Sequence, residues 1–152
     1  MITDSPDAVF TRLARDEDAE ALASLVGALA HEAPGQEIHA NNLQGILASS
    51  RDRLWVMEGN AELLGYLHAI YSTRLASSPF IEIVGLVVSA SARRRGLATQ
   101  LLSQAESWAR ELGMTLRVRC REDREQGNEF YQALGFELTK RQNVYEKSIL
   151  PG

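Results

Sequence analysis

The chain has 152 residues, of which 45% are hydrophobic and 24% charged, as in an ordinary soluble globular domain. Its formal net charge of -4 argues against a general nucleic-acid-binding protein, because that class depends on a basic surface. Cys120 is the one cysteine, which excludes an internal disulfide, and we see no signal peptide or apolar run long enough to span a bilayer. We therefore expect a single cytoplasmic domain over residues 1–152 that binds neither nucleic acid nor membranes.

The first part of the chain predicts a strand followed by helices and a hairpin. Residues 9–14 form a short β-rich run, and residues 15–30 carry apolar side chains at helical spacing, with Asp16 placed to cap the helix. Residues 34–50 indicate a second helix, broken at its glycine. Two β-rich runs within residues 53–72 flank a Gly-Asn pair at positions 59 and 60, which predicts a β-hairpin.

The middle of the chain carries the clearest patterns. Residues 79–88 are almost continuously apolar, which predicts a central strand buried on both faces. From Gly96 the apolar residues take a helical period, and Gly113 ends this helix. The remainder predicts a strand over residues 114–120, a short helix over residues 124–134 and two more strands over residues 136–149. Strands and helices alternate, so the predicted fold class is mixed α/β.

Three arginines at residues 93–95 stand between the apolar strand and the long helix. The first N–H groups of a helix have no intrahelical partner and lie at the positive end of its dipole, so this turn can hold an anion. Gly96 would let a phosphate approach the backbone, Ala98 keeps the next contact small, and Thr99 offers a hydroxyl. No triphosphate or dinucleotide loop signature is present. The alternative is a solvated basic turn, and these residues alone leave both interpretations open.

Two motifs resemble one enzyme family. The stretch Arg93-Arg94-Arg95-Gly96-Leu97-Ala98 resembles the R/Q-x-x-G-x-G/A signature of the GNAT family of N-acetyltransferases. Residues 127–136 (GNEFYQALGF) resemble the later A-x-x-F-Y-x-x-x-G-F motif, and residues 85–92 (GLVVSASA) look like the strand end that precedes the first motif. The motifs stand in the family's order and spacing. The resemblance covers nearly the whole chain, although residues 34–50 match only as a generic helical region.

This resemblance implies a fold, a cosubstrate and a reaction. The implied GNAT fold has a mixed, mostly antiparallel sheet that is split at a bulged strand and flanked by helices, and Gly85 is compatible with such a bulge. The implied reaction is direct transfer of an acetyl group from acetyl-CoA to an amine. The pyrophosphate of coenzyme A would lie on the arginine turn and the pantetheine along the central strand, with no metal. The residues expected to bind the coenzyme are Leu86, Val87, Val88, Arg93, Arg94, Arg95, Gly96, Leu97, Ala98, Thr99, Asn128 and Tyr131.

The reaction leaves two catalytic roles to assign. The amine must lose a proton before it attacks, and the departing thiolate benefits from a proton donor. Glu82 is the first candidate base, because desolvation on an apolar strand would strengthen it and because histone-acetylating members share its position. The alternatives are an ion-paired or solvated carboxylate, or a base role for His68 on the neighbouring strand. Tyr131 matches the tyrosine that family members place near the coenzyme sulfur, and its alternative role is packing.

Substrate and coenzyme contacts stay open in part. Many relatives carry an asparagine where this chain has Arg124, so the resemblance leaves open whether Arg124 or Asn128 contacts the coenzyme. Arg117 and Arg119 share one face of a predicted strand, and they would favour an acidic or zwitterionic amine only if they face the substrate. The leading hypothesis is N-acetylation of a small primary amine, by analogy with small-molecule acetyltransferases of the family; a homodimer is one option. The alternatives are acetylation of a protein N-terminus or lysine, and a non-catalytic acyl-CoA-binding domain.

Overall fold

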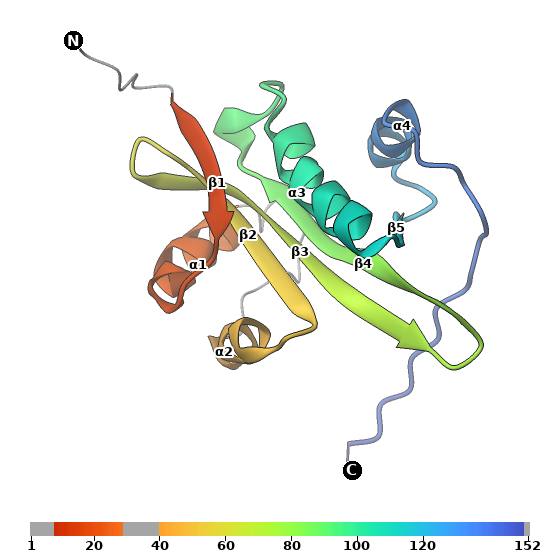
Figure 1. Cartoon of the computed structure of the whole chain (residues 1–152). Helices are drawn as coiled ribbons and strands as arrows, with labels where there is room; N and C mark the ends of the chain where they lie inside the picture. Colours follow the sequence, from red (N-terminus) through yellow and green to blue (C-terminus); the bar gives the residue numbers. More distant parts are fainter. Residues whose placement is uncertain (1–7, 29–39, 151–152) are drawn as a thin grey trace. The chain divides into compact units, whose positions relative to one another are not determined.

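The computed structural model describes residues 8–28 and 40–150, in two compact units, Met1–Val118 and Arg119–Gly152. A single domain over the whole chain stays a prediction. The parts of residues 15–30 and 34–50 that lie at 29–39 are outside the described residues. Within the described ranges, every helix is too short or too polar to cross a membrane. The elements of the first unit (Figure 1) are β1 (Val9–Leu13), η1 (Asp16–Asp18), α1 (Ala19–Ala28), α2 (Ala40–Ala48), β2 (Asp52–Gly59), β3 (Glu62–Arg74), β4 (Ser77–Val88), η2 (Ala90–Ala92), α3 (Leu97–Leu112) and β5 (Thr115–Val118).

The strands described for the first unit form one mixed sheet in the order β1-β2-β3-β4-β5. Neighbouring strands from β1 to β4 are antiparallel, and β5 runs parallel to β4. The predicted hairpin joins β2 to β3, but its two turn residues are Asn60 and Ala61, one position later than expected. Both have positive φ, 53° and 62°, which is the conformation of a type I′ turn. Gly59 is instead the last residue of β2 and pairs with Glu62 of β3.

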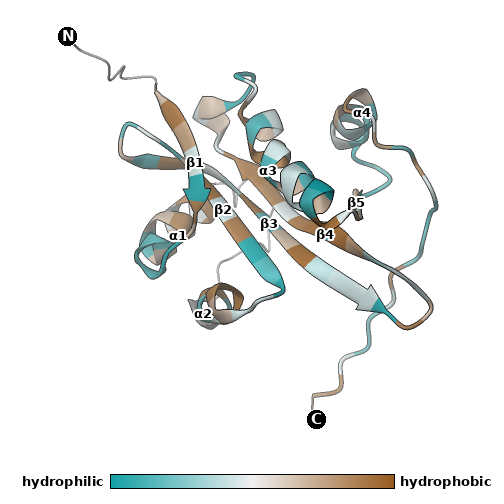
Figure 2. Cartoon of the chain, viewed as in Figure 1, coloured by the Kyte–Doolittle hydropathy of each residue, from teal (hydrophilic) through white to brown (hydrophobic). Residues whose placement is uncertain are grey.

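Helices pack on both faces of the sheet. Leu54 and Val56 of β2 form one core with Leu22 of α1 and Leu43 of α2. Trp55 points to the opposite face, since side chains alternate along a strand, and meets Trp108 of α3 edge-on with ring centroids 6.1 Å apart. Figure 2 shows hydrophobic residues concentrated in the strands, while α3 carries both hydrophilic and hydrophobic patches. The sheet therefore separates an α1/α2 face from an α3 face.

Strand β4 is buried on both faces only in its middle. Residues from Phe80 to Ile83 are buried, and here β4 pairs with β3 on one side and with β5 on the other. Val84 is 48% exposed. The prediction of complete burial is wrong for the second half, because β5 ends at Val118, opposite Ile83. From Gly85 onward, β3 is the single described strand beside β4.

Helix α3 follows its prediction closely, whereas α1 and α2 each differ in one respect. Gly96 and Gly113 flank α3 with φ of 73° and 66°. α2 runs without a break through Gly45, because an exposed glycine weakens a helix without ending it. At the start of η1, which leads into α1, the capping carboxylate belongs to Asp18 rather than to the predicted Asp16. The Asp18 Oδ2 accepts the backbone N–H of Arg15 at 2.7 Å.

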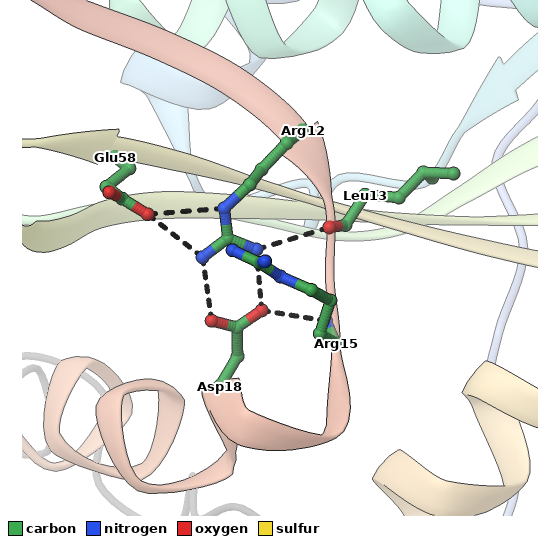
Figure 3. Close-up of polar contacts among 5 residues, drawn as sticks. All are labelled: Arg12, Leu13, Arg15, Asp18 and Glu58. Carbon is green, nitrogen blue, oxygen red and sulfur yellow. Dashed lines mark hydrogen bonds and ion pairs between the residues drawn. The ribbon is translucent and has the colours of Figure 1, made fainter.

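Arg12 joins this capping carboxylate to the sheet (Figure 3). Its guanidinium donates to both oxygens of Asp18 at 2.8 Å and to Oε1 of Glu58 at 3.0 and 3.2 Å. The hydrogen bond from Arg12 is the main cause that holds the pKa of Asp18 below its ordinary value, and the same contact raises the pKa of Arg12. The network therefore ties β1, β2 and the start of α1 together through charge-assisted hydrogen bonds.

The second unit contains the predicted short helix, α4 (Glu125–Ala133). The two strands predicted over residues 136–149 are absent from the described structure, in which residues 136–150 take no regular secondary structure. Large apolar side chains in this segment are exposed, including Tyr145 at 87% and Ile149 at 84%. β-rich composition supplies only a preference for extended backbone, and a strand forms when a partner strand satisfies its N–H and C=O groups.

Candidate functional site

The predicted anion-binding turn connects β4 to α3. After β4 the chain passes through η2, and Gly96 then caps α3 with a φ of 73°, a conformation that favours glycine. Arg94 also has a positive φ, 65°. A Cβ added at Gly96 would meet no atom within 4 Å, so the space beside its backbone is open. Gly96 thus meets a conformational requirement and leaves room for a ligand.

The side chains of this turn give it a local positive charge. Arg93, Arg94 and Arg95 are all exposed, and Arg93 Nε donates to the carbonyl oxygen of Val88 at 3.4 Å. Leu97 is buried at 3% exposure, so it can offer a ligand only its backbone N–H. Of the other two predicted contacts, Ala98 is half-buried and Thr99 is exposed at the first turn of the helix. The turn therefore combines guanidinium groups with the unpaired N–H groups of a helix N-terminus.

Strand β4 is bulged at Val84, as predicted for the segment that leads into this turn. His68 pairs with Gly85 and the next residue, Ala69, pairs with Ile83, so Val84 is an extra residue in β4. The predicted coenzyme-binding residues Leu86, Val87 and Val88 follow this bulge and are half-buried. Because β5 does not extend beside them, the sheet is split there and one edge of β4 is available.

Two glycines bring the backbones and one aromatic ring close together around the bulge. A Cβ on Gly65 would lie 2.6 Å from the carbonyl oxygen of Val87, and one on Gly85 would lie 3.2 Å from Cε1 of Tyr66. The ring of Tyr66 therefore lies beside Gly85, and burial raises the pKa of its hydroxyl. Sequence reasoning did not select Gly65 or Tyr66. The available signal was a glycine inside a strand pattern, which indicates a close approach of other atoms.

The two candidate bases lie on one face of the sheet, the α1/α2 face. Glu82 is buried at 8% exposure, as predicted, and pairs with Ile70 of β3. His68 lies two residues before Ile70, so its side chain points to the same face. Its Nε2 lies 2.6 Å from Oδ1 of Asp52, which fixes the orientation of the imidazole. Asp52 was not predicted, because this contact depends on the exact register of the hairpin.

Tyr131 belongs to α4 in the second unit. Its ring packs edge-on against Phe130 and Phe136, with centroids 5.2 and 5.6 Å away. Burial is the main cause that raises the pKa of Tyr131; Cys120 adds to the shift and Arg124 opposes it. The hydroxyl is therefore protonated at neutral pH. This environment accommodates both interpretations of Tyr131, packing and proton donation.

The other predicted residues of the second unit are engaged locally. The side-chain nitrogen of Asn128 donates to the carbonyl oxygens of Arg121 at 2.9 Å and Arg124 at 2.6 Å, which leaves Oδ1 as its remaining polar atom. Arg119 Nη1 donates to Oε1 of Gln142 at 3.0 Å. β5 ends at Val118, so the expectation that Arg117 and Arg119 share one strand face is wrong.

Comparison with known proteins identifies the family. The acetyltransferase (GNAT) family matches residues 14–136. The aminoglycoside N(6')-acetyltransferase type 1 of Salmonella typhimurium is 32% identical over 130 residues, which cover 78% of this chain and 79% of that protein. The structure of AAC(6')-Iy with the bisubstrate analogue CoA-S-monomethyl-acetylneamine has a TM-score of 0.79 at 23% identity, covering 93% of this chain and 99% of that one. A transcriptional regulator from Bacillus halodurans C-125 has a TM-score of 0.81 at 22% identity, covering 92% and 100%. This chain therefore belongs to the acetyltransferase (GNAT) family.

Proposed function

We propose that the protein transfers the acetyl group of acetyl-CoA directly to the primary amine of a small molecule. Its family makes it an acyl-CoA-dependent N-acetyltransferase. The observation that carries the proposal is the continuous path from the split in the sheet to the Gly96 turn. One edge of β4 is available from Gly85 to Val88, and the chain then leads into a positively charged helix N-terminus. A long ligand that ends in a pyrophosphate matches this order of groups.

The residues on this path fit coenzyme A by their chemistry. The backbone groups of Leu86, Val87 and Val88 would bind the pantetheine arm as a neighbouring strand would. The turn from Arg93 to Thr99 would bind the pyrophosphate, because arginine donates charge-assisted hydrogen bonds and the glycine admits a phosphate to the backbone. When bound, acetyl-CoA supplies a thioester whose carbonyl carbon is reactive toward an amine.

Glu82 is the proposed base that accepts the proton of the attacking amine, directly or through water. It is the buried carboxylate of β4, two residues before the bulge. Glu82→Gln should lower kcat by roughly 10²- to 10⁴-fold at neutral pH. Activity should recover at high pH, where the amine is already deprotonated in solution and needs no base on the enzyme. Glu111→Gln, an exposed carboxylate at the end of α3, is the matched control. An equal loss for Glu82→Gln at every pH would contradict the role of a base.

Tyr131 is the proposed donor to the departing thiolate, because its phenol is held protonated by burial. Asn128 is the less direct contact of the two, because its amide nitrogen already bonds backbone carbonyls within its own unit. Both roles rest on the match of residues 127–136 to the later family motif and on these local environments.

A thiol-release assay tests the proposed function. It follows coenzyme A release from acetyl-CoA in the presence of amino acids, aminophosphonates, polyamines, aminoglycosides and peptides. We expect turnover with one class of small amine. Turnover with peptides alone would assign the protein to protein acetylation. Tight acetyl-CoA binding without turnover on any class would identify a non-catalytic binding domain and overturn the proposal. A homodimer and a cytoplasmic location stay predictions.

A further inference from the structure

Two arginines surround Phe80 on the α1/α2 face of the sheet. The guanidinium carbon of Arg117 lies 4.0 Å from the centroid of the Phe80 ring, and that of Arg74 lies 5.3 Å from it. Phe80 is two residues before Glu82 on β4 with no bulge between them, so both side chains point to the same face. Arg117 of β5 is the register partner of Glu82. The arginine pair, Arg74 and Arg117, is therefore next to the proposed base.

Both members of the arginine pair keep hydrogen-bond donors for a ligand. A guanidinium that lies over an aromatic ring uses its flat face and leaves the N–H groups at its edge free to bind. Arg74 Nη1 donates one bond, to Oγ of Ser72 at 2.6 Å, which helps to hold the side chain near the ring. Each guanidinium carries five N–H donors, so contacts with neighbouring side chains leave other donors for a ligand.

We infer that the arginine pair binds an anionic group of the acceptor, so that the acceptor is a small amine that also carries a carboxylate or a phosphonate. The inference rests on the proposed function, in which Glu82 receives the amine. Residues two apart on a strand are separated by about 7 Å, a distance that a short molecule with an amine and an anion can span. Two positive charges beside the base attract such a zwitterion and repel a polycation. An aminoglycoside, the substrate class in the names of the curated relatives, is a polycation and is disfavoured.

Isothermal titration of the coenzyme A-saturated protein tests this specificity. The probes are β-alanine, 4-aminobutyrate and 2-aminoethylphosphonate, each beside a counterpart that lacks the anionic group (the two amides and ethanolamine), together with 1,4-diaminobutane and kanamycin. We expect at least one anionic amine to bind about 10- to 100-fold more tightly than its counterpart, the range for hydrogen bonds to charged groups. Equal binding within every pair, no measurable binding of the anionic amines, or tighter binding of kanamycin would overturn the inference.

Substitutions assign the preference to the arginine pair. Arg117→Gln should reduce the preference for the anionic amine at least tenfold, and Arg74→Gln should reduce it less, because Arg74 is exposed and farther from the ring. Arg53→Gln is the matched control, since Arg53 lies 4.6 Å from the Trp108 ring on the α3 face and should leave the preference unchanged. Unchanged coenzyme A affinity and thermal midpoint show that each variant is folded. An unchanged preference in folded Arg117→Gln would also overturn the inference.

Turnover of the same probes separates this inference from the proposed function. Acetylation of kanamycin, or of the amines that lack an anionic group without any preference for the anionic ones, would reject the arginine pair as a specificity site and leave the proposed function standing. Preferential binding of anionic amines without turnover would support the arginine pair and reject the proposed function.

Discussion

Gly65→Ala tests how closely β3 approaches β4 at the split in the sheet. The added Cβ would lie 2.6 Å from the carbonyl oxygen of Val87 and 3.2 Å from Cδ1 of Leu101. Carbon–oxygen contacts between strands normally lie at about 3.3–3.6 Å, so the two backbones must separate by roughly 0.7 Å or more. Overpacking of this kind costs about 1–3 kcal/mol. Alanine lowers the entropy of the unfolded chain, which offsets about 0.4–1 kcal/mol, and we expect a net loss of about 1–2 kcal/mol.

Gly45→Ala is the matched control and should change stability in the opposite direction. Gly45 is exposed in the middle of α2, and a Cβ there would meet no atom within 4 Å. The substitution should raise the free energy of unfolding by about 0.5–1 kcal/mol. Urea unfolding measures both variants, with an unchanged m-value as the sign that only stability differs. Coenzyme A affinity should fall for Gly65→Ala alone. Wild-type stability of Gly65→Ala would refute the close approach of β3 and β4.

Three further substitutions test the turn, the proton donor and the buried ion pair. Gly96→Val should weaken coenzyme A binding about tenfold or more, because a β-branched residue at a φ of 73° costs on the order of 1–3 kcal/mol; wild-type affinity by calorimetry would contradict the phosphate-binding role. Tyr131→Phe should slow acetyl transfer by roughly 10²-fold or more with little change in acetyl-CoA affinity, and unchanged turnover would remove its role as donor. Asp18→Asn should lower the free energy of unfolding by about 2 kcal/mol at pH 7. Because the pKa of Asp18 is lowered in the folded state, this contribution is present above the ordinary carboxyl pKa of about 3.9 and is lost as pH falls through the lowered value. The difference in urea midpoint between Asp18→Asn and wild type should therefore shrink below about pH 4, and a difference that does not depend on pH would contradict the ion pair.

Local patterns predicted the parts of the fold that depend on neighbours in the chain. α3 follows from its apolar period, and its two flanking glycines follow from the backbone conformation at helix ends. The contacts between Asp52 and His68, and between Arg117 and Phe80, could not be predicted in this way. Each depends on the register of strands that are far apart in the sequence, and a shift of one residue would turn the side chains to the opposite face.

The segment 136–149 shows the limit of propensity. Its β-rich composition predicted strands, yet a strand also requires a partner, and composition carries no record of one. The predicted cap residue at the acidic start of this helical region was wrong for a more local reason. Asp16 and Asp18 are both acceptable cap residues by composition, and the choice of Asp18 is made by Arg12, which comes from the preceding strand.

The bulge at Val84 has a consequence for how β4 can change during evolution or engineering. Before the bulge, the even-numbered residues Phe80 and Glu82 point to the α1/α2 face; after it, Gly85 and Val87 point to that face as the register partners of His68 and Tyr66. Because of this one extra residue, the α1/α2 face receives even-numbered side chains before the bulge and odd-numbered side chains after it. Deletion of Val84 would restore strict alternation and leave Gly85 and Val87 on the same face as Glu82, because Val84 is the residue without a register partner. A deletion of one residue at the bulge therefore keeps the side chains of β4 on their present faces, whereas a deletion of one residue elsewhere in the paired strand would turn the side chains on one side of it to the opposite face.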